Sequence, residues 1–354
     1  MSAVADREYF GRQLQALLGG ATAEEETDSA SPDVRANSAQ GGVSAADEPV
    51  SAENYRVVAA DSADRSQAHT NAAFSEKWAR YARSEERERL YEMQRRWYLC
   101  LYGFRSESEL GGFLRERRVI LDAGCGLGYK SAWFAQLAPR SLVIGMDFSD
   151  AAAQAAAQYR SLPNLFFVRG DIARTGLPSG SIDYVSCDQV IMHTEDPDAT
   201  FAELVRIMAP AGQLACYFYA QKALPRELLD DHFRRRCTDM TAAELWAMSE
   251  QLTELGKRLT ELNVTIDAPA IPALGIAAGR YDLQRFIYWN FIKCFWNPDL
   301  GRETSVATNF DWYSPSNARR YSEAQVRALV SATGLETLHF HHEEACYSGR
   351  FAKS

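Results

Sequence analysis

The sequence predicts an α/β protein built around a mostly parallel sheet. Between residues 119 and 220, short apolar runs alternate with helical segments, and repeated strand–helix units place helices on both faces of a parallel sheet. A glycine-rich turn directly follows the first apolar run, as expected where a buried strand turns into a helix. With 354 residues and 46% hydrophobic residues, the chain can bury a sizeable core.

Residues 1–70 are predicted to form a mostly disordered acidic leader. From Gly19 to Asn54 there is no aromatic residue, so little apolar surface is available to offset the entropy cost of ordering. Residues 7–18 have the apolar spacing of a short helix, which we expect to fray. Removing residues 1–54 is therefore expected to leave thermal stability nearly unchanged.

Residues 71–118 are predicted to form helices that precede the sheet. Phe74, Trp78 and Tyr81 recur at helical spacing in the first part of this segment. A second apolar set continues the spacing at Met93, Trp97, Leu101 and Phe104.

The core predicted for residues 119–220 contains strands at 119–121, 142–146, 165–168, 184–187 and 213–219. An acidic residue stands at the end of, or just past, each of the first four strands: Asp122, Asp147, Asp171 and Asp188. Ligands of open parallel sheets bind beyond the carboxyl ends of the strands. The sequence therefore predicts a binding site at this edge.

The turn after the first strand has glycine at 124, 126 and 128, with Cys125 between the first two. Glycine at these positions lets the backbone adopt positive φ angles and approach a ligand closely. Tyr129 occupies the position at which the dinucleotide fingerprint Gly-x-Gly-x-x-Gly needs its third glycine. The pattern therefore differs from that of a nicotinamide-binding turn.

Asp-x-Gly-x-Gly-x-Gly after a strand resembles the first motif of class I S-adenosylmethionine-dependent methyltransferases. The resemblance covers residues 119–220 closely and 321–353 more loosely, and is greatest to ubiquinone and menaquinone methyltransferases and other small-molecule enzymes. It implies a Rossmann-like seven-stranded sheet that is mostly parallel and closes with an antiparallel hairpin. It also implies that residues 311–354 complete the core with a helix and that hairpin.

The resemblance implies a role for each motif residue in binding S-adenosylmethionine. Asp122 would help to hold the amino group of the methionine part, and the backbone of Gly124, Cys125, Gly126 and Gly128 would pass beneath that part. Asp147 would accept both ribose hydroxyls.

The remaining motif residues would contact the adenine and the reacting centre. Phe148 would pack on the adenine, and Asp171 would accept from its exocyclic amine with the Ile172 backbone nearby. Asp188 and Gln189 would lie near the sulfonium.

His193 is the candidate catalytic residue, as a base or a substrate contact. Relatives often have a histidine pair here, whereas this chain has Met192-His193, and a histidine that caps or packs the following helix is an equal alternative. Arg234-Arg235-Arg236 could clamp an acidic substrate, although a solvated helix face is the commoner meaning of such a run.

Residues 221–310 have helical patterns without a strand signal and are predicted to form a helical lid over the substrate. Within it, leucines repeat at 245–262 with the spacing of a helix-packing seam. An intramolecular helix pair is favoured, and a homodimer through this seam is the alternative. Residues 281–296 are predicted to continue as one aromatic-rich helix.

Composition and charge exclude several kinds of partner. A formal charge of −9 argues against nucleic acid, and no uncharged apolar run approaches the roughly twenty residues that stable membrane insertion needs. The N-terminus lacks the pattern of a secretory signal, so a cytoplasmic protein is expected. The 7 cysteines form no Cys-x-x-Cys pair, and no metal site is predicted.

We therefore predict a methyltransferase that uses S-adenosylmethionine and acts on a small molecule by in-line displacement. Two alternatives stay open at this point. The first is a cofactor-binding regulatory or assembly module without catalysis, and the second is a nicotinamide-dependent dehydrogenase, against which Tyr129 counts.

Overall fold

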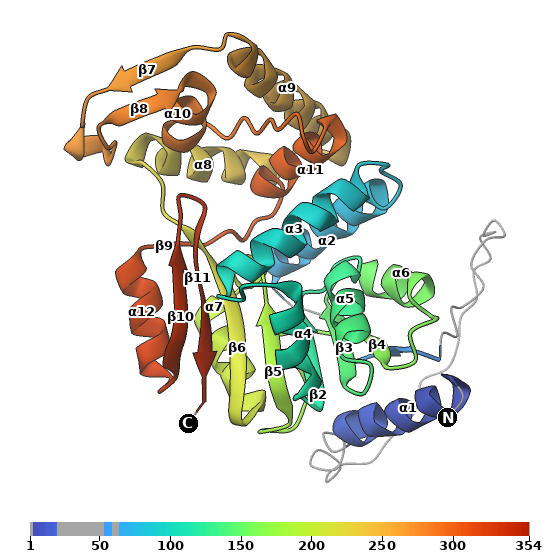
Figure 1. The fold of residues 1–354 in the computed structure, drawn as a ribbon. Coiled ribbons are helices and arrows are strands. Elements are labelled where there is room, and N and C mark those ends of the chain that lie inside the picture. Colours follow the sequence, from blue (N-terminus) through green and yellow to red (C-terminus); the bar gives the residue numbers. More distant parts are fainter. Residues whose placement is uncertain (1–2, 20–52, 59–63, 354) are drawn as a thin grey trace, which may run out of the picture.

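The computed structural model describes residues 3–19, 53–58 and 64–353 and is organised around a 9-stranded sheet (Figure 1). The strand order is β1-β4-β3-β2-β5-β6-β11-β10, and β9 pairs with β6. Only β11 is antiparallel to its neighbours β6 and β10. The strands are β1 Tyr55–Val57, β2 Val119–Ala123, β3 Leu142–Asp147, β4 Leu165–Arg169, β5 Ile182–Cys187, β6 Met208–Ala220, β9 Arg320–Tyr321, β10 Glu336–His342 and β11 Cys346–Ala352.

The predicted Rossmann-like α/β fold with a terminal antiparallel hairpin is confirmed, but the expected number of seven strands is wrong. β1 adds one parallel strand beside β4, and β9 pairs with the end of β6. With 3 and 2 residues respectively, these strands are too short to show a period-2 pattern in the sequence.

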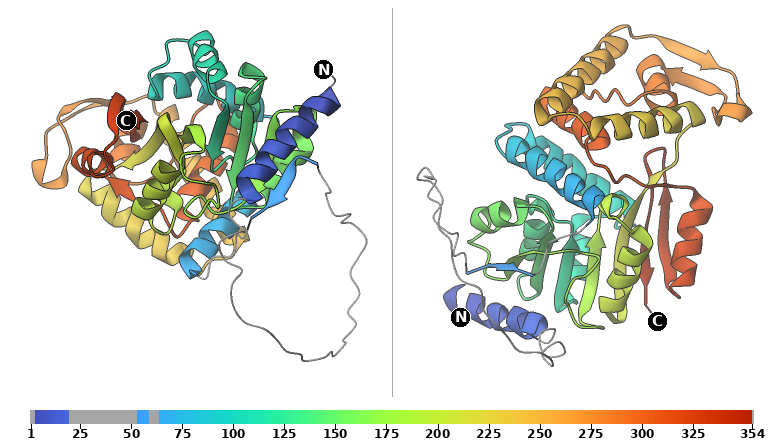
Figure 2. Two further views of the ribbon diagram at one scale, coloured as in Figure 1. Left: turned by 90° about the horizontal axis from the view of Figure 1, so that it is seen from below. Right: turned by 180° about the vertical axis from the view of Figure 1, so that it is seen from behind.

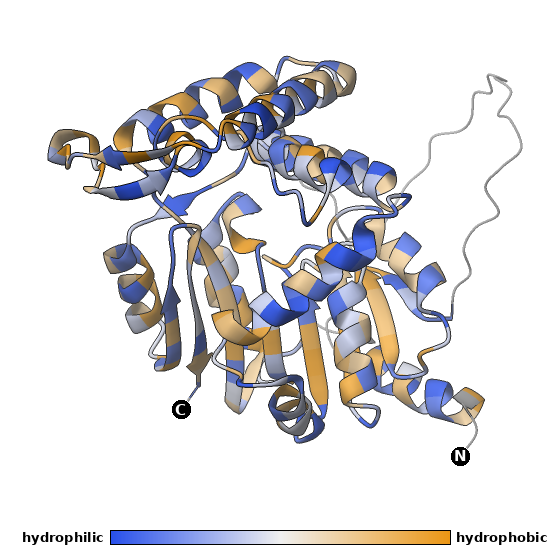
Figure 3. Cartoon of the chain, turned by 45° about the horizontal axis from the view of Figure 1, so that its top comes forward, coloured by the Kyte–Doolittle hydropathy of each residue, from blue (hydrophilic) through white to orange (hydrophobic). Residues whose placement is uncertain are grey.

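Helices cover both faces of the sheet, as the views in Figure 2 show. Alternate strand residues point to opposite faces, so Leu121 and Ile144 enter one core and Ile120 and Val143 the other. The first face packs against α1 Ala3–Gly19, α7 Pro197–Ile207 and α12 Glu323–Ala332; the second packs against α4 Glu107–Arg115, α5 Tyr129–Leu137 and α6 Ala151–Gln158. The central strands are accordingly strongly hydrophobic (Figure 3).

The N-terminal helix is part of the core, which corrects the expectation of a frayed helix in a disordered leader. Phe10 and Leu14 of α1 are buried in the same cluster as Phe166 of β4. Arg7 also donates hydrogen bonds to the backbone carbonyls of Arg160 and Leu162. The predicted disorder of residues 20–52 and 59–63 lies outside the described residues.

A layer of helices lies above the carboxyl edge of the sheet (Figure 1). It combines two parts of the chain that are far apart in sequence. These elements are α2 Arg65–Tyr81 and α3 Arg87–Leu101, then α8 Leu224–Cys237, α9 Ala242–Glu261, α10 Leu283–Asn290 and α11 Arg302–Tyr313. A capping box of Thr241 and Glu244 begins α9, and another of Ser322 and Gln325 begins α12.

Two expectations for residues 221–310 are wrong. An antiparallel ribbon of β7 Thr265–Ala268 and β8 Gly279–Asp282 interrupts the helices, and its mostly exposed residues carry little apolar patterning. The aromatic helix ends at Asn290 instead of continuing to residue 296. The Asn309 side chain accepts from the Phe295 N–H at 2.8 Å and donates to the Phe295 carbonyl at 3.0 Å, which holds this segment in a non-helical conformation.

The leucine repeat of α9 packs against the rest of the protein mainly in its N-terminal half. Leu245 is buried with Trp246, whose ring stacks on Phe310 of α11 at a centroid distance of 3.9 Å. Leu255 and Leu262 are 41% and 60% exposed. An intramolecular helix pair therefore uses the first half of the repeat, and a homodimer through residues 245–262 stays a prediction. None of the described helices is both long and apolar enough to cross a membrane.

The packing of α1 predicts that Leu14→Ala lowers the free energy of unfolding by about 2–5 kcal/mol, because it leaves a cavity against the sheet. Chemical denaturation of the full chain measures this. Gln15→Ala changes an exposed neighbour on the same helix and is the control. Equal stabilities for the two variants would contradict the docking of α1.

Candidate functional site

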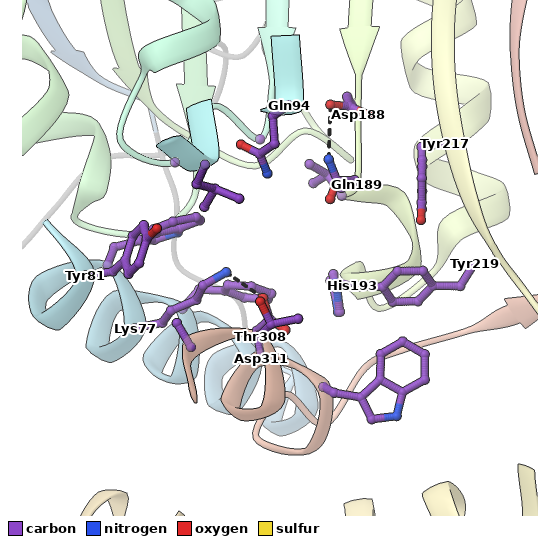
Figure 4. Close-up of a pocket in the computed structure, with 18 of the residues that line it drawn as sticks. Lys77, Tyr81, Gln94, Asp188, Gln189, His193, Tyr217, Tyr219, Thr308 and Asp311 are labelled. Atoms are coloured by element: carbon purple, nitrogen blue, oxygen red, sulfur yellow. Dashed lines mark hydrogen bonds and ion pairs between the residues drawn. The ribbon is translucent and has the colours of Figure 1, made fainter. Parts of the chain in front are cut away.

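A cavity of about 740 Å³ lies between the carboxyl edge of the sheet and the helical layer (Figure 4). This volume is within the usual range for small-molecule sites. The cavity brings together ten of the residues predicted from the sequence: Gly124, Cys125, Gly126, Asp147, Phe148, Asp171, Ile172, Asp188, Gln189 and His193. Asp122 and Gly128 do not line it.

The glycine turn has the positive φ angles that its sequence predicted. Gly124, Gly126 and Gly128 have φ angles of +79°, +52° and +75°, which residues with a Cβ rarely adopt. A Cβ on Gly128 would lie 2.6 Å from the Phe167 ring, so this glycine serves packing behind the cavity. A Cβ on Gly126 would lie 3.0 Å from the ring of Trp78, which covers the turn from α2.

Asp147 joins the end of β3 to the glycine turn. One carboxylate oxygen accepts from the Gly126 N–H at 2.7 Å, and the other accepts from the Ser149 N–H at 2.9 Å and its hydroxyl at 2.6 Å. Burial raises the pKa of Asp147, and the bonds from Ser149 and Gly126 oppose that shift. A carboxylate has about four acceptor positions, and three of those on Asp147 are used by these bonds. One ligand hydroxyl can donate to the remaining position. A second ligand hydroxyl can donate to the position that becomes free if the Ser149 hydroxyl rotates away.

Lys130 is a central residue of the site that the sequence analysis missed. Its ammonium lies 2.9 Å from Asp188 and 3.7 Å from Asp122. Burial alone would lower the pKa of Lys130, but the two carboxylates raise it well above its ordinary value. Tyr102 donates to the other oxygen of Asp188 at 2.8 Å, so this carboxylate is held in one orientation at the cavity wall.

The structure places Asp122 behind the cavity, contrary to the expected contact with a ligand amino group. It is fully buried, accepts from the Ser131 hydroxyl at 2.7 Å and faces Lys130. Lys130 and Asp188, unlike Asp122, line the cavity. The sequence pattern located the end of β2 correctly but did not show that a lysine from the next helix covers its carboxylate.

Gln189 sits beside Asp188 in a conformation that indicates a functional constraint. Its φ is +65°, an uncommon value for a residue other than glycine, and such strained residues concentrate at functional sites. Its amide donates to Asp188 at 3.4 Å, and both side chains face the cavity (Figure 4).

His193 is buried in the cavity wall. Its Nδ1 lies 2.7 Å from the Asn317 carbonyl, so Nδ1 carries the proton of the neutral ring and Nε2, 3.4 Å from the Tyr219 hydroxyl, is the acceptor. Burial lowers the pKa of His193 to about 4. The rings of Phe74 and Tyr219 pack against it edge-on, so the alternative of a packing histidine also agrees with its surroundings.

An ion pair closes the cavity on the side of the helical layer. Lys77 of α2 and Asp311 of α11 lie 2.6 Å apart, and both side chains are mostly buried. Tyr217, Tyr219 and Trp312 add aromatic surface nearby. Because these residues come from distant segments, no local spacing in the sequence indicated that they meet.

The three arginines at 234–236 lie on α8, and their side chains have different surroundings. Arg234 is buried, donates to the Pro315 carbonyl at 3.0 Å and packs over Trp312, whereas Arg235 and Arg236 are exposed. The run therefore does not act as one clamp. Within the described ranges, no group of three His, Cys, Asp or Glu side chains could hold a metal ion.

Comparison with known proteins identifies the domain around this cavity. Residues 121–216 match the family described as "Methyltransferase domain". Trans-aconitate 2-methyltransferase from Deinococcus radiodurans is 34% identical over 125 residues, which cover 35% of this chain and 44% of that protein. Demethylmenaquinone methyltransferase from Listeria welshimeri is 27% identical over 121 residues, which cover 32% of this chain and 51% of that protein. The chain spans 26–44% of the length of the first four curated relatives.

Among solved structures, magnesium protoporphyrin IX methyltransferase from Synechocystis with bound SAH has a TM-score of 0.43 and 15% identity. That comparison covers 81% of this chain and 97% of the other. The matched residues 121–216 contain the glycine turn and the strand-end carboxylates that line the cavity. Residues 121–216 of this chain are thus similar to the domain described for methyltransferases.

Proposed function

We propose that the protein transfers a methyl group from S-adenosylmethionine to a small molecule with appreciable apolar surface. The observation that carries this proposal is the shared cavity, in which the glycine turn and strand-end carboxylates face an aromatic wall. The aromatic side chains favour an acceptor with an apolar body over a small, fully polar metabolite.

The side chains at the sheet edge fit the cofactor by their chemistry. Asp147 offers carboxylate oxygens to the ribose hydroxyls, and Phe148 offers a ring to the adenine. One oxygen of Asp171 accepts from the Ala173 N–H at 2.8 Å. The other lies 3.6 Å from Nε of the exposed Arg174 and can also accept from the adenine amine, with Ile172 beside it.

The centre of the edge suits the cationic part of the cofactor. Gly124, Cys125 and Gly126 line the part of the cavity in which the methionine tail would lie, and Asp188 and Gln189 line the space beside it. When bound, S-adenosylmethionine supplies a methyl group already activated by its sulfonium. Asp122 has an indirect role, because it helps to position Lys130 and through it Asp188.

The protein contributes chiefly by holding and enclosing the reactants. Correct alignment of two reactants can supply on the order of 7–11 kcal/mol of the barrier reduction. The Lys77–Asp311 pair joins α2 to α11 across the cavity and so restricts the entry of water.

His193 acts in this proposal as a neutral hydrogen-bond acceptor for the methyl acceptor. With a pKa of about 4 it is uncharged at neutral pH. Its single free lone pair, on Nε2, makes only a long contact of 3.4 Å with the Tyr219 hydroxyl at the cavity wall, and the methyl acceptor would replace that contact. A base with so low a pKa removes protons weakly. We therefore assign it to orienting the acceptor and receiving a proton only as the methyl group is transferred.

The most direct test incubates the full chain with a metabolite extract and methyl-labelled S-adenosylmethionine. Mass spectrometry should detect a labelled small molecule that is absent without the protein. Retention of cofactor without any labelled product would contradict catalysis and support a non-catalytic module. Calorimetric titration with NAD beside S-adenosylhomocysteine tests the dehydrogenase alternative, and we expect heat only from S-adenosylhomocysteine.

Asp147→Ala is expected to weaken S-adenosylhomocysteine binding by more than tenfold, because it removes the carboxylate offered to the ribose. Calorimetry measures the affinity, and circular dichroism checks that the variant is folded. Ser149→Ala is the matched control, since it removes a bond to Asp147 but keeps the carboxylate. An unchanged affinity in Asp147→Ala would exclude the assignment.

His193 also predicts a pH dependence of stability. Its folded pKa of about 4 lies below the unfolded value of 6.5, so stability is lost as the pH falls from about 6.5 to about 4. The contribution is roughly 3 kcal/mol. Denaturation of His193→Gln should show a flatter pH profile than the wild type, while the exposed His232→Gln should keep the wild-type profile. Identical profiles for all three proteins would contradict a buried neutral His193.

A further inference from the structure

The cavity has a cluster of cations at the side away from the cofactor carboxylates. Lys222, Arg226 and Lys293 all line the cavity. Lys222 follows β6 and donates to the Ala345 carbonyl beside β11, whereas Asp147 and Asp171 follow β3 and β4. In the sheet order, β2 and β5 separate these two sides. The cavity is therefore acidic at one side and basic at the other.

The positive charge of this cluster is only partly compensated. Arg226 pairs with Asp230 at 2.7 Å, but Lys222 and Lys293 form no ion pair with a carboxylate among the described residues. Lys222 instead donates to the backbone carbonyls of Ala220 and Glu344, both at 2.6 Å, and of Ala345 at 3.2 Å. Its three N–H groups are thus used, and no carboxylate in the part of the chain that the structure describes pairs with the charge of its protonated form.

Lys293 differs from its neighbours because its ammonium makes no hydrogen bond within the described part of the chain. The residue is only 6% exposed and lines the cavity. Its ammonium lies over the rings of Trp312 at 4.4 Å, Tyr288 at 5.8 Å and Phe295 at 6.0 Å from their centroids. The ammonium therefore faces the cavity without an anionic partner in the described ranges, and the aromatic faces offset only part of the cost of its partial burial.

The surrounding electrostatics agree with a missing anion. Burial, together with the charges of Arg226 and Lys293, lowers the pKa of Lys222 to about 7, although Glu227 opposes the shift. The Tyr288 ring is within 6 Å of three cations, Arg226, Arg285 and Lys293. Like charges gathered this closely repel one another, so a bound anion would relieve the repulsion.

We propose that this cluster, which we call the cationic subsite, binds an anionic oxygen group on the methyl acceptor, with Lys293 as its direct ligand. The group is a carboxylate or a phosphate, because both offer oxygen acceptors to a free ammonium. The acceptor is then an acid with an aromatic or apolar body, which packs on the neighbouring rings of Tyr288 and Trp289. The identification of this ligand as the methyl acceptor rests on the proposed function.

The test uses the full chain saturated with S-adenosylhomocysteine and three probes with the same aromatic body. Calorimetry measures the affinities of 2-naphthoate, 2-naphthyl phosphate and the neutral 2-naphthamide. We expect at least one anion to bind ten times more tightly than the amide. The tighter of the two anions identifies the preferred group.

Lys293→Gln should weaken binding of the preferred anion at least tenfold and leave the amide unchanged, because it removes the free ammonium but keeps a side chain of similar length. Lys293→Arg keeps the charge and should retain the preference for anions. Lys257→Gln is the matched control, since this partly exposed lysine of α9 lies outside the cavity. If circular dichroism shows that Lys293→Gln is unfolded, Lys222→Gln provides a second test, because it should also weaken binding of the preferred anion.

Three results would overturn the cationic subsite. These are equal affinities for the anions and the amide, no binding of any probe, and an unchanged anion affinity in folded Lys293→Gln. A separate titration with S-adenosylhomocysteine distinguishes the two proposals. Cofactor binding without anion preference refutes only the cationic subsite, whereas anion preference without cofactor binding refutes the proposed methyl transfer.

Discussion

The buried ammonium of Lys130 is the contact on which the site depends. It lies between Asp122 of β2 and Asp188 just past β5, and so joins two neighbouring strands to the first turn of α5. The glycine turn connects β2 to Lys130. The contacts of Lys130 with the two carboxylates therefore also hold the backbone of the glycine turn in place. Breaking such a buried set by removing one member typically costs about 3–5 kcal/mol, because a charge is left without a partner.

The cavity above this contact divides its charges by position along the sheet. Carboxylates gather where β3 and β4 end, and cations gather beside β6 and β11. In the proposed reaction, the acidic side suits the cofactor with its cationic centre, and the basic side suits the acid group that we propose for the methyl acceptor. The division follows from topology, because neighbouring strands lie side by side and each loop contributes its residues at a fixed place.

The enclosing layer explains why much of the site escaped local sequence patterns. α2 and α11 are more than two hundred residues apart, yet Lys77 and Asp311 meet at 2.6 Å. Lys293 lies in a segment whose apolar spacing predicted a continuing helix, whereas the side chain of Asn309 holds that segment extended. A contact of this kind depends on the chain's path, which helical periodicity does not describe.

The central strands of the sheet, the glycine turn and the carboxylates at the sheet edge were predictable from the sequence, whereas the short strands β1 and β9 were not. Each depends on local patterns, and parallel strands bring their carboxyl ends together without further information. The tertiary structure alone decided that Asp122 is covered by Lys130, that Phe10 and Leu14 dock on the sheet, and that unpaired Lys293 faces the cavity. These outcomes depend on which distant side chains share a buried space, because burial and charge pairing are properties of the folded arrangement.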